Sequence, residues 1–312
     1  MRYRHQEIFG RIGKKGQKRL GESSVAVVGA GAIGSRSSEL LARSGIGKLI
    51  LIDRDFVELE NLQSQLYTEE DIGKPKADAA CAHLKKINSG INIRAYAEDL
   101  NCVNVNMIKS DLVLDCTDNF ETRFLINDFC SKNKIPWIHS AAVRELGTIL
   151  AVNGSPCLSC ILGSPKSSET CSTSGILNTT AGIVSSIQAN EAVKILLGER
   201  CERSLIRINS WENSITKIRV KRNPECDACG GEYSHLENKE SIIKFCGSEI
   251  YQIKGKISLN EARAKLKRLG KTRDFGSCLQ FRNITLFKNR ALVRAGSEKE
   301  AKSIYSKFIG NI

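Results

Sequence analysis

A glycine-rich turn near the start of the chain constrains the fold more than any other feature. Gly29, Gly31 and Gly34 form the pattern G-x-G-x-x-G between an apolar strand pattern at 24–29 and a helical pattern at 32–43. In such a turn the first glycine permits the tight bend, the second lets the backbone approach a phosphate, and the third lets helix and strand pack closely. We therefore expect an α/β sheet that begins at this turn.

The residue that ends the next strand pattern extends this interpretation. Asp53 lies 19 residues beyond Gly34, where its carboxylate can accept a hydrogen bond from a ribose hydroxyl. Strand, turn, helix and acid together predict nucleotide binding. They do not separate ATP from NAD, and a glycine turn kept only for packing stays open as the alternative.

Alternating strand and helix patterns predict a Rossmann-like, mostly parallel sheet with helices on both faces. Helices are expected at 32–43, 76–87, 121–130 and 182–197, and strands at 24–29, 48–53, 91–97, 111–118, 136–142, 204–210 and 214–222. This domain, residues 1–231, ends at a polar, glycine-containing stretch. A small α+β domain at 240–312 follows in the order β-β-α-β-β-α, with helices at 259–269 and 298–309.

The apolar content and the net charge of the chain bear on its cellular location and on the kind of partner it binds. Among 312 residues we find no apolar run of membrane-spanning length and no secretory leader, so we expect a cytoplasmic protein without a membrane partner. The net charge is +13, and the segment from Glu232 onward carries 17 Lys or Arg against 8 Asp or Glu. That excess either recruits an acidic partner or simply keeps the surface solvated.

Twelve cysteines in a chain without a leader point to metal binding or thiol chemistry rather than to disulfides. Two C-x-x-C pairs, Cys157 with Cys160 and Cys226 with Cys229, match the spacing of a structural zinc site. Four thiolates fill a tetrahedral ion completely, so such a site clips loops together and leaves no position for a substrate. A redox C-x-x-C is the alternative. Cysteines outside these pairs, apart from Cys171, are interpreted as structural.

Several motifs in one order resemble the adenylyltransferase family of MoeB, ThiF and HesA, relatives of the ubiquitin-activating enzymes. They are RYRHQ, GQKRL, VVGAGAIGS, LIDRDFVELENLQSQLY, DIGKPKA, LVLDCTDNFETR, TCSTSGIL and the two C-x-x-C pairs, and they run to Gly230. The resemblance implies ATP-dependent adenylation of the C-terminal glycine of a small ubiquitin-like or sulfur-carrier protein ending in Gly-Gly. The products are an acyl-adenylate and pyrophosphate.

The resemblance also assigns roles to individual residues. It gives Asp53 the ribose, Lys76 the phosphates and Asp118 the magnesium ion near the α-phosphate. Lys76 has an alternative as an ordinary first-turn helix residue, and Asp118 as the N-cap of the helix that follows. The other positions that the resemblance assigns to the nucleotide are Gly29, Gly31, Gly34, Asp55, Asn61 and Gln65.

Two arginines of the family pattern are missing. His5 replaces one in Arg2-Tyr3-Arg4-His5-Gln6, and Ser64 replaces the other in Asn61-Leu62-Gln63-Ser64-Gln65. A serine or a neutral histidine does not reproduce a bidentate cation on a phosphate. Arg2 or Arg4, after a small shift, and Lys76 are expected to supply the remaining charge. A non-catalytic scaffold that binds a ubiquitin-like protein is therefore the alternative function.

A further cysteine, Cys171, lies in the Ser/Thr-rich stretch after the first C-x-x-C pair. The resemblance implies thioester formation or sulfur transfer there, and a buried apolar thiol is the alternative. It also implies a homodimer in which the N-terminal segment contributes to the partner's site. The basic C-terminal domain is expected to bind the carrier or a downstream acceptor. An NAD oxidoreductase is disfavoured, because no hydride-transfer acid–base pair follows the glycine turn.

Overall fold

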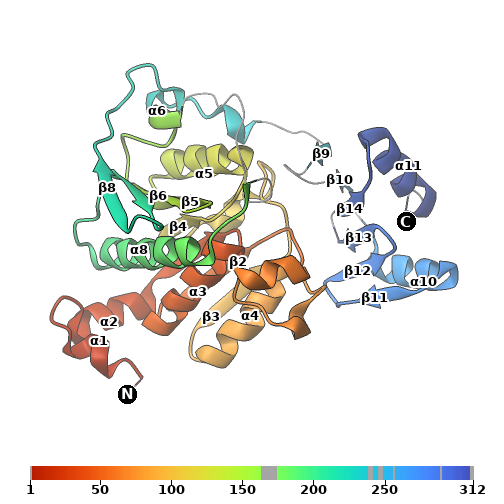
Figure 1. Ribbon diagram of the computed structural model, residues 1–312, viewed down its shortest axis with the longest axis horizontal. Coiled ribbons are helices and arrows are strands. Elements are labelled where there is room, and N and C mark those ends of the chain that lie inside the picture. Colours follow the sequence, from red (N-terminus) through yellow and green to blue (C-terminus); the bar gives the residue numbers. More distant parts are fainter. Residues whose placement is uncertain are drawn as a thin grey trace. The chain divides into compact units, whose positions relative to one another are not determined.

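The computed structural model describes residues 2–162, 174–237, 242–244, 249–255, 257–288 and 290–309. The chain divides into two compact units, Met1–Asn238 and Lys239–Ile312 (Figure 1).

The first unit is built on an eight-stranded sheet in the order β3-β2-β1-β4-β5-β6-β7-β8. Neighbours from β3 to β5 are parallel, and those from β5 to β8 are antiparallel. The sheet is therefore mixed, with a parallel core that carries the glycine turn. Its strands are β1 Ser24–Val28, β2 Lys48–Ile52, β3 Asn92–Tyr96, β4 Leu112–Asp115, β5 Trp137–Val143, β6 Leu146–Val152, β7 Leu205–Asn209 and β8 Ser214–Ile218.

Helices cover both faces of this sheet, with α3 and α8 on one side and α5 on the other (Figure 1). Longer helices fill the crossovers between parallel strands, and short helical turns lie in the connecting loops. The helices are α1 Arg4–Ile8, α2 Gly13–Glu22, α3 Ala32–Ser44, α4 Lys76–Ile87, α5 Phe120–Asn133, α6 Ser159–Leu162, α8 Asn178–Leu197 and α9 Asp227–Gly230. The 3-10 turns are η1 Leu59–Gln63, η2 Glu69–Asp71, η3 Val105–Ile108 and η4 Ser234–Leu236.

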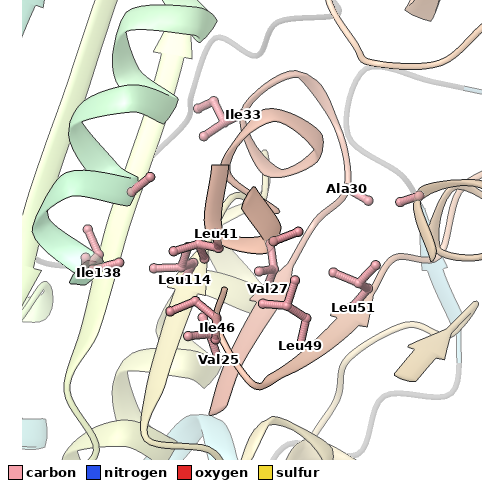
Figure 2. Packing of buried hydrophobic residues seen from close by; sticks show 14 of the residues in the cluster. Val25, Val27, Ala30, Ile33, Leu41, Ile46, Leu49, Leu51, Leu114 and Ile138 are labelled. Atoms are coloured by element: carbon pink, nitrogen blue, oxygen red, sulfur yellow. The ribbon is translucent and has the colours of Figure 1, made fainter. Parts of the chain in front are cut away.

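Alternate residues of the central strands feed two separate cores, as a sheet with two buried faces requires. Val25 and Val27 of β1 pack with Leu41 of α3 and with Leu114 and Ile138 in one core (Figure 2). The intervening residues, such as Ala26 and Val28, belong to the other core, beneath α5. This arrangement confirms the predicted α/β sheet and fixes the ends of β1, β2 and β4 at one edge.

The second unit is a six-stranded antiparallel sheet in the order β11-β12-β13-β14-β10-β9. Two helices supply Ala262, Leu266 and Ala301 to its own apolar core. The elements are β9 Ile242–Lys244, β10 Ile250–Lys254, α10 Leu259–Leu269, β11 Thr272–Asp274, β12 Cys278–Phe281, β13 Ile284–Phe287, β14 Arg290–Arg294 and α11 Glu298–Phe308.

Three strands were not predicted from the sequence, β6, β11 and β12, and neither were the helices α1, α2, α6 and α9. In addition, α8 begins at Asn178, four residues before the expected start at 182. Two of the missed strands form hairpins through turns that hold an arginine with positive φ, Arg144 at 54° before β6 and Arg282 at 52° after β12. Glycine or asparagine usually occupies the positive-φ position of such a turn, and here arginine occupies it in both turns, although Asn283 follows Arg282.

Candidate functional site

The glycine turn has the geometry that its three glycines predict. A Cβ on Gly29, whose φ is +89°, would lie 2.6 Å from the Cys116 carbonyl oxygen, and one on Gly34 would lie 1.8 Å from the Gly29 carbonyl oxygen. Both positions exclude a side chain. A Cβ on Gly31 would meet no atom within 4 Å among the described residues. The second glycine therefore faces open space, which is where a phosphate would approach.

Two acids and a lysine stand beside this turn, at the ends of β2 and at the start of α4. Asp53 is buried; its Oδ2 accepts from the Ala30 amide at 2.6 Å and its Oδ1 from the Asp55 amide at 2.7 Å. The Lys76 ammonium is also buried and lies 3.7 Å from Oδ2 of Asp55. The predicted ribose acid, Asp53, and the predicted phosphate lysine, Lys76, thus both lie next to the second acid, Asp55.

The charges of these groups are coupled. Burial and the neighbouring Asp55 raise the pKa of Asp53, against the opposing charge of Lys76. Burial lowers the pKa of Lys76, but the carboxylates of Asp55, Asp53 and Asp118 outweigh it, so this pKa is raised. Lys76 therefore carries a persistent positive charge in a buried place, which an ordinary first-turn lysine has no reason to do.

Asp118 follows β4, next to β1 in the sheet, and is exposed. Its charge raises the pKa of Lys76 and also that of Arg54, so it acts on the same group of side chains. The alternative role as a helix N-cap is wrong. Asn119 is the N-cap of α5, and its side chain accepts from the Thr122 amide at 2.8 Å. The Asp118 carboxylate is not used for capping.

The two polar residues predicted to contact the nucleotide differ in their surroundings. Asn61 closes a local cap in η1, where its Oδ1 accepts from the Glu58 amide at 2.9 Å. Gln65 has a buried Oε1 with no hydrogen-bond partner among the described residues. A buried acceptor of this kind is costly unless a ligand satisfies it. Gln65 is therefore the better placed of the two to contact a bound molecule.

Two groups at this edge were not predicted from the sequence. The Tyr67 hydroxyl lies 2.7 Å from the Ala30 carbonyl oxygen and 3.2 Å from that of Lys76, so it joins the glycine turn to the start of α4. Nothing in the sequence marks it, because its role depends on a long-range approach of two backbones.

The second unpredicted group is a buried ionic cluster at the end of β4. Asp115 Oδ2 lies 2.7 Å from His139 Nδ1 and 3.7 Å from Arg123 Nε, and its Oδ1 accepts from the Thr117 hydroxyl at 2.7 Å. Burial acts to raise the pKa of Asp115, but the bond to His139 and the nearby charges lower it overall. Burial lowers the pKa of His139. The cluster therefore fixes the loop that presents Asp118.

The N-terminal segment contacts the C-terminal ends of α3 and α4, away from the glycine turn and Lys76. The Arg2 guanidinium donates to the Ile87 carbonyl at 2.6 Å, and Gln6 donates to the Ser44 carbonyl at 3.0 Å. Ile87 ends α4, whereas Lys76 begins it, and the twelve residues of this helix span about 18 Å. Within one chain a small shift therefore does not bring Arg2 to Lys76, and the expectation that Arg2 or Arg4 supplies phosphate charge stays a prediction. Exposed His5 lies on the same segment.

The four paired cysteines come together although the two pairs lie far apart in the sequence. Their sulfur atoms all lie within 4.8 Å of one another, with individual separations of 3.4–4.0 Å. Four sulfurs at 2.3 Å from one tetrahedral ion stand about 3.8 Å apart. The cluster fits a metal ion, and a redox role for either pair alone does not explain why both pairs meet.

Two further expectations concern Cys171 and membrane-spanning helices. Cys171 lies outside the described residues. Within the described ranges, no helix is both long enough and apolar enough to cross a bilayer.

Comparisons with known proteins agree with this geometry. The sulfur carrier protein ThiS adenylyltransferase of Bacillus subtilis (strain 168) is 37% identical over 336 aligned residues, which cover 99% of each chain. The SAMP-activating enzyme E1 of Haloferax volcanii is 36% identical over 73% of this chain and 88% of its own. The crystal structure of Escherichia coli MccB with MccA-N7isoASN shares the fold, with a TM-score of 0.66 and 23% identity over 74% of this chain and 75% of that one.

The resemblance read from the motifs is confirmed. The model of the ThiF family matches residues 3–228, which contain the glycine turn, the acids, the lysine and three of the four clustered cysteines, Cys157, Cys160 and Cys226. The chain belongs to the ThiF family.

Proposed function

We propose that the protein is an adenylyltransferase that uses ATP to activate the C-terminal glycine of a small sulfur-carrier protein. A carboxylate oxygen of that glycine attacks the α-phosphorus, and the bond from this phosphorus to the bridging oxygen breaks. Pyrophosphate leaves with the electron pair, and the carrier is left as an acyl-adenylate. The ThiS and SAMP activation named for the two relatives supports this substrate class.

One observation carries the proposal: the open Gly31, the buried Lys76 and the exposed Asp118 share one end of the parallel strands. Asp53 would hold the ribose, Lys76 the charge that develops on the phosphate oxygens, and Gln65 a nucleotide donor. Asp118, with Asp55 nearby, would hold Mg²⁺. When bound, that ion neutralises phosphate charge and fixes phosphate geometry.

The clustered cysteines are proposed as a structural zinc site, because thiolate-only ligation leaves no open coordination position. One zinc ion per chain is expected in native mass spectrometry. A folded chain that contains no metal would contradict the assignment.

Thioester formation or sulfur transfer through Cys171 is proposed as the step after adenylation. The carrier's acyl carbon would pass from the adenylate to the thiolate, and AMP would leave. Cys171→Ala is expected to keep adenylate formation and lose the later step. Loss of both steps together would show that this cysteine serves the fold instead.

We also propose a homodimer in which the N-terminal segment serves the partner's site. On its own chain Arg2 docks at the far end of α4, about 18 Å along the helix from Lys76, which leaves it too far from the local phosphates. Arg4→Ala should lower ATP turnover without changing the fold, and mixing it with a Lys76→Met chain should restore part of the activity. Absence of any restoration in a confirmed mixed dimer would argue against sharing.

Exchange of labelled pyrophosphate into ATP tests the main proposal. The chain should catalyse exchange in the presence of a ThiS-type or SAMP-type carrier that ends in Gly-Gly, and not with the same carrier lacking its last glycine. A chain that binds the carrier but neither binds ATP nor supports exchange would be a scaffold. The replacement of two family arginines by His5 and Ser64 makes that second candidate worth testing.

A further inference from the structure

The nucleotide site holds few cations that are not already neutralised. Lys76 lies 3.7 Å from Asp55, Arg54 3.0 Å from Asp99, and the Arg123 guanidinium 3.7 Å from Asp115. Each of these cations therefore has a carboxylate to balance. A triphosphate brings about four negative charges, so a cation of this chain that has no carboxylate partner would add to the charge supplied by the proposed Mg²⁺ and by the partner's N-terminal segment.

Arg36 is such a cation, and its position suits this role. It lies four residues beyond Ala32, the first residue of α3, which puts its Cα about 6 Å along the axis from the helix start. Helical side chains lean toward the N-terminus, so a side chain as long as arginine reaches back to the turn where the phosphates are expected. Among the described residues no carboxylate lies within ion-pair distance of it.

One hydrogen bond orients the Arg36 side chain. Its Nε donates to the Ser64 carbonyl oxygen at 3.3 Å, and the neighbouring Ser35 hydroxyl accepts from the Leu66 amide at 3.3 Å. The carbonyl takes only Nε, so the two terminal nitrogens have no described partner. The guanidinium is thus held against the segment that carries Gln65, with its outer edge available to a ligand.

The Ser64 side chain, whose backbone Arg36 contacts, cannot supply positive charge to a phosphate. Ser64 is buried, and its hydroxyl is neutral. We infer that Arg36, reaching from α3 to the backbone of Ser64, binds the terminal phosphates of ATP. This assignment rests on the proposed adenylation. We expect the contact to be with the β- and γ-phosphates, because the ribose is proposed to lie at Asp53 whereas the Arg36 side chain is held at the Ser64 carbonyl oxygen.

The competing interpretation makes Arg36 a purely structural link between α3 and the segment around Ser64. The two interpretations predict different ligand dependence. A phosphate contact affects ATP and leaves AMP unaffected, whereas a structural link affects both nucleotides alike and lowers the melting temperature.

The test compares Arg36→Ala and Arg36→Lys with the wild-type chain. The matched control is Arg43→Ala, because Arg43 lies on the same helix and, among the residues that the structure describes, forms an ion pair only with Glu39, at 2.6 Å. The alanine variant should raise the KM for ATP by about tenfold to a hundredfold, as expected for loss of a charge-assisted contact. The lysine variant should fall between alanine and wild type. The Kd for AMP should stay within about twofold of the wild-type value. The melting temperature should stay within a few degrees of wild type, which is roughly the effect of an ordinary surface substitution.

Two outcomes would overturn the inference. One is an unchanged KM for ATP in Arg36→Ala, and the other is an equal loss of ATP and AMP affinity together with a lower melting temperature. Both leave the adenylation proposal intact as long as the wild-type chain exchanges pyrophosphate. A wild-type chain that neither binds ATP nor supports exchange would overturn both.

Discussion

We expect two neighbouring residues after β4 to have different roles, Asp118 in the reaction and Asn119 in the stability of the fold. Asp118 is exposed, whereas Asn119 caps α5 through its bond to the Thr122 amide. We expect Asp118→Asn to reduce exchange at least about a hundredfold, as loss of electrostatic stabilisation does. Its unfolding free energy should stay within about 0.5 kcal/mol, since an exposed side chain is changed.

Asn119→Ala should show the opposite pattern. Loss of the cap costs about 1 kcal/mol of unfolding free energy, measured by denaturant titration, and exchange should persist. Equal loss of activity in the two variants would mean that the loop conformation, and not the Asp118 carboxylate, supports the reaction.

At this scale the sequence predicts residues whose role lies within a local motif. The glycines, Asp53, Lys76 and Asp118 all belong to continuous motifs, and the structure gathers them at one edge. Tyr67 and His139 act through partners far away in the sequence, Ala30 and Asp115, so no local pattern marks them. Arg36 carries a long-range contact of the same kind, inside a helix whose pattern indicates only packing.

The turn and helix α3 form one element in which two glycines have different tasks. A side chain on Gly34 would overlap the Gly29 carbonyl at 1.8 Å, whereas one on Gly31 would enter open space. We expect Gly34→Ala to lower the unfolding free energy by about 3 kcal/mol or more, because backbone must move. Gly31→Ala should keep wild-type stability and lose ATP affinity, because the methyl group occupies the space for the phosphate.

Calorimetric ATP titration and thermal melts on both variants separate these effects. If Gly31→Ala binds ATP as tightly as the wild-type chain, the phosphate does not lie beside Gly31.

Element boundaries show why part of the fold escaped prediction. The parallel core was predictable, because its strands are short apolar runs followed by helical patterns. The antiparallel additions depend on hairpin turns, and Arg144 and Arg282 occupy left-handed backbone positions where glycine would have given a signal. An arginine at such a turn cannot be told from an ordinary polar residue in the sequence. The hairpins that contain β6 and β12 were therefore not predicted.

At the scale of the whole chain, the cysteine cluster closes a long excursion. Cys157 and Cys226 are 69 residues apart, and α8, β7 and β8 lie between them. A bound metal would hold the far side of the mixed sheet in place, at a gain on the order of 10 kcal/mol. The residues proposed to bind the nucleotide lie at the parallel strands, so we expect a metal at the cysteine cluster to support the sheet and not the reaction.

The C-terminal unit is expected to serve partner binding and not the chemistry. Residues 239–312 carry 17 Lys or Arg and 6 Asp or Glu, a net charge of +11, and they form their own apolar core. The proposed nucleotide residues all lie before Asn238, in a unit with two cores of its own. A chain ending at Asn238 should therefore keep its kcat for exchange within about twofold, while its KM for the carrier rises and loses its dependence on salt.

A charge reversal tests the same expectation without deleting any core. Lys267→Glu with Arg268→Glu, both exposed on α10, should change the carrier KM and its salt dependence in the same direction. If carrier KM and salt dependence match those of the full chain in both variants, the positive charge only keeps this surface solvated.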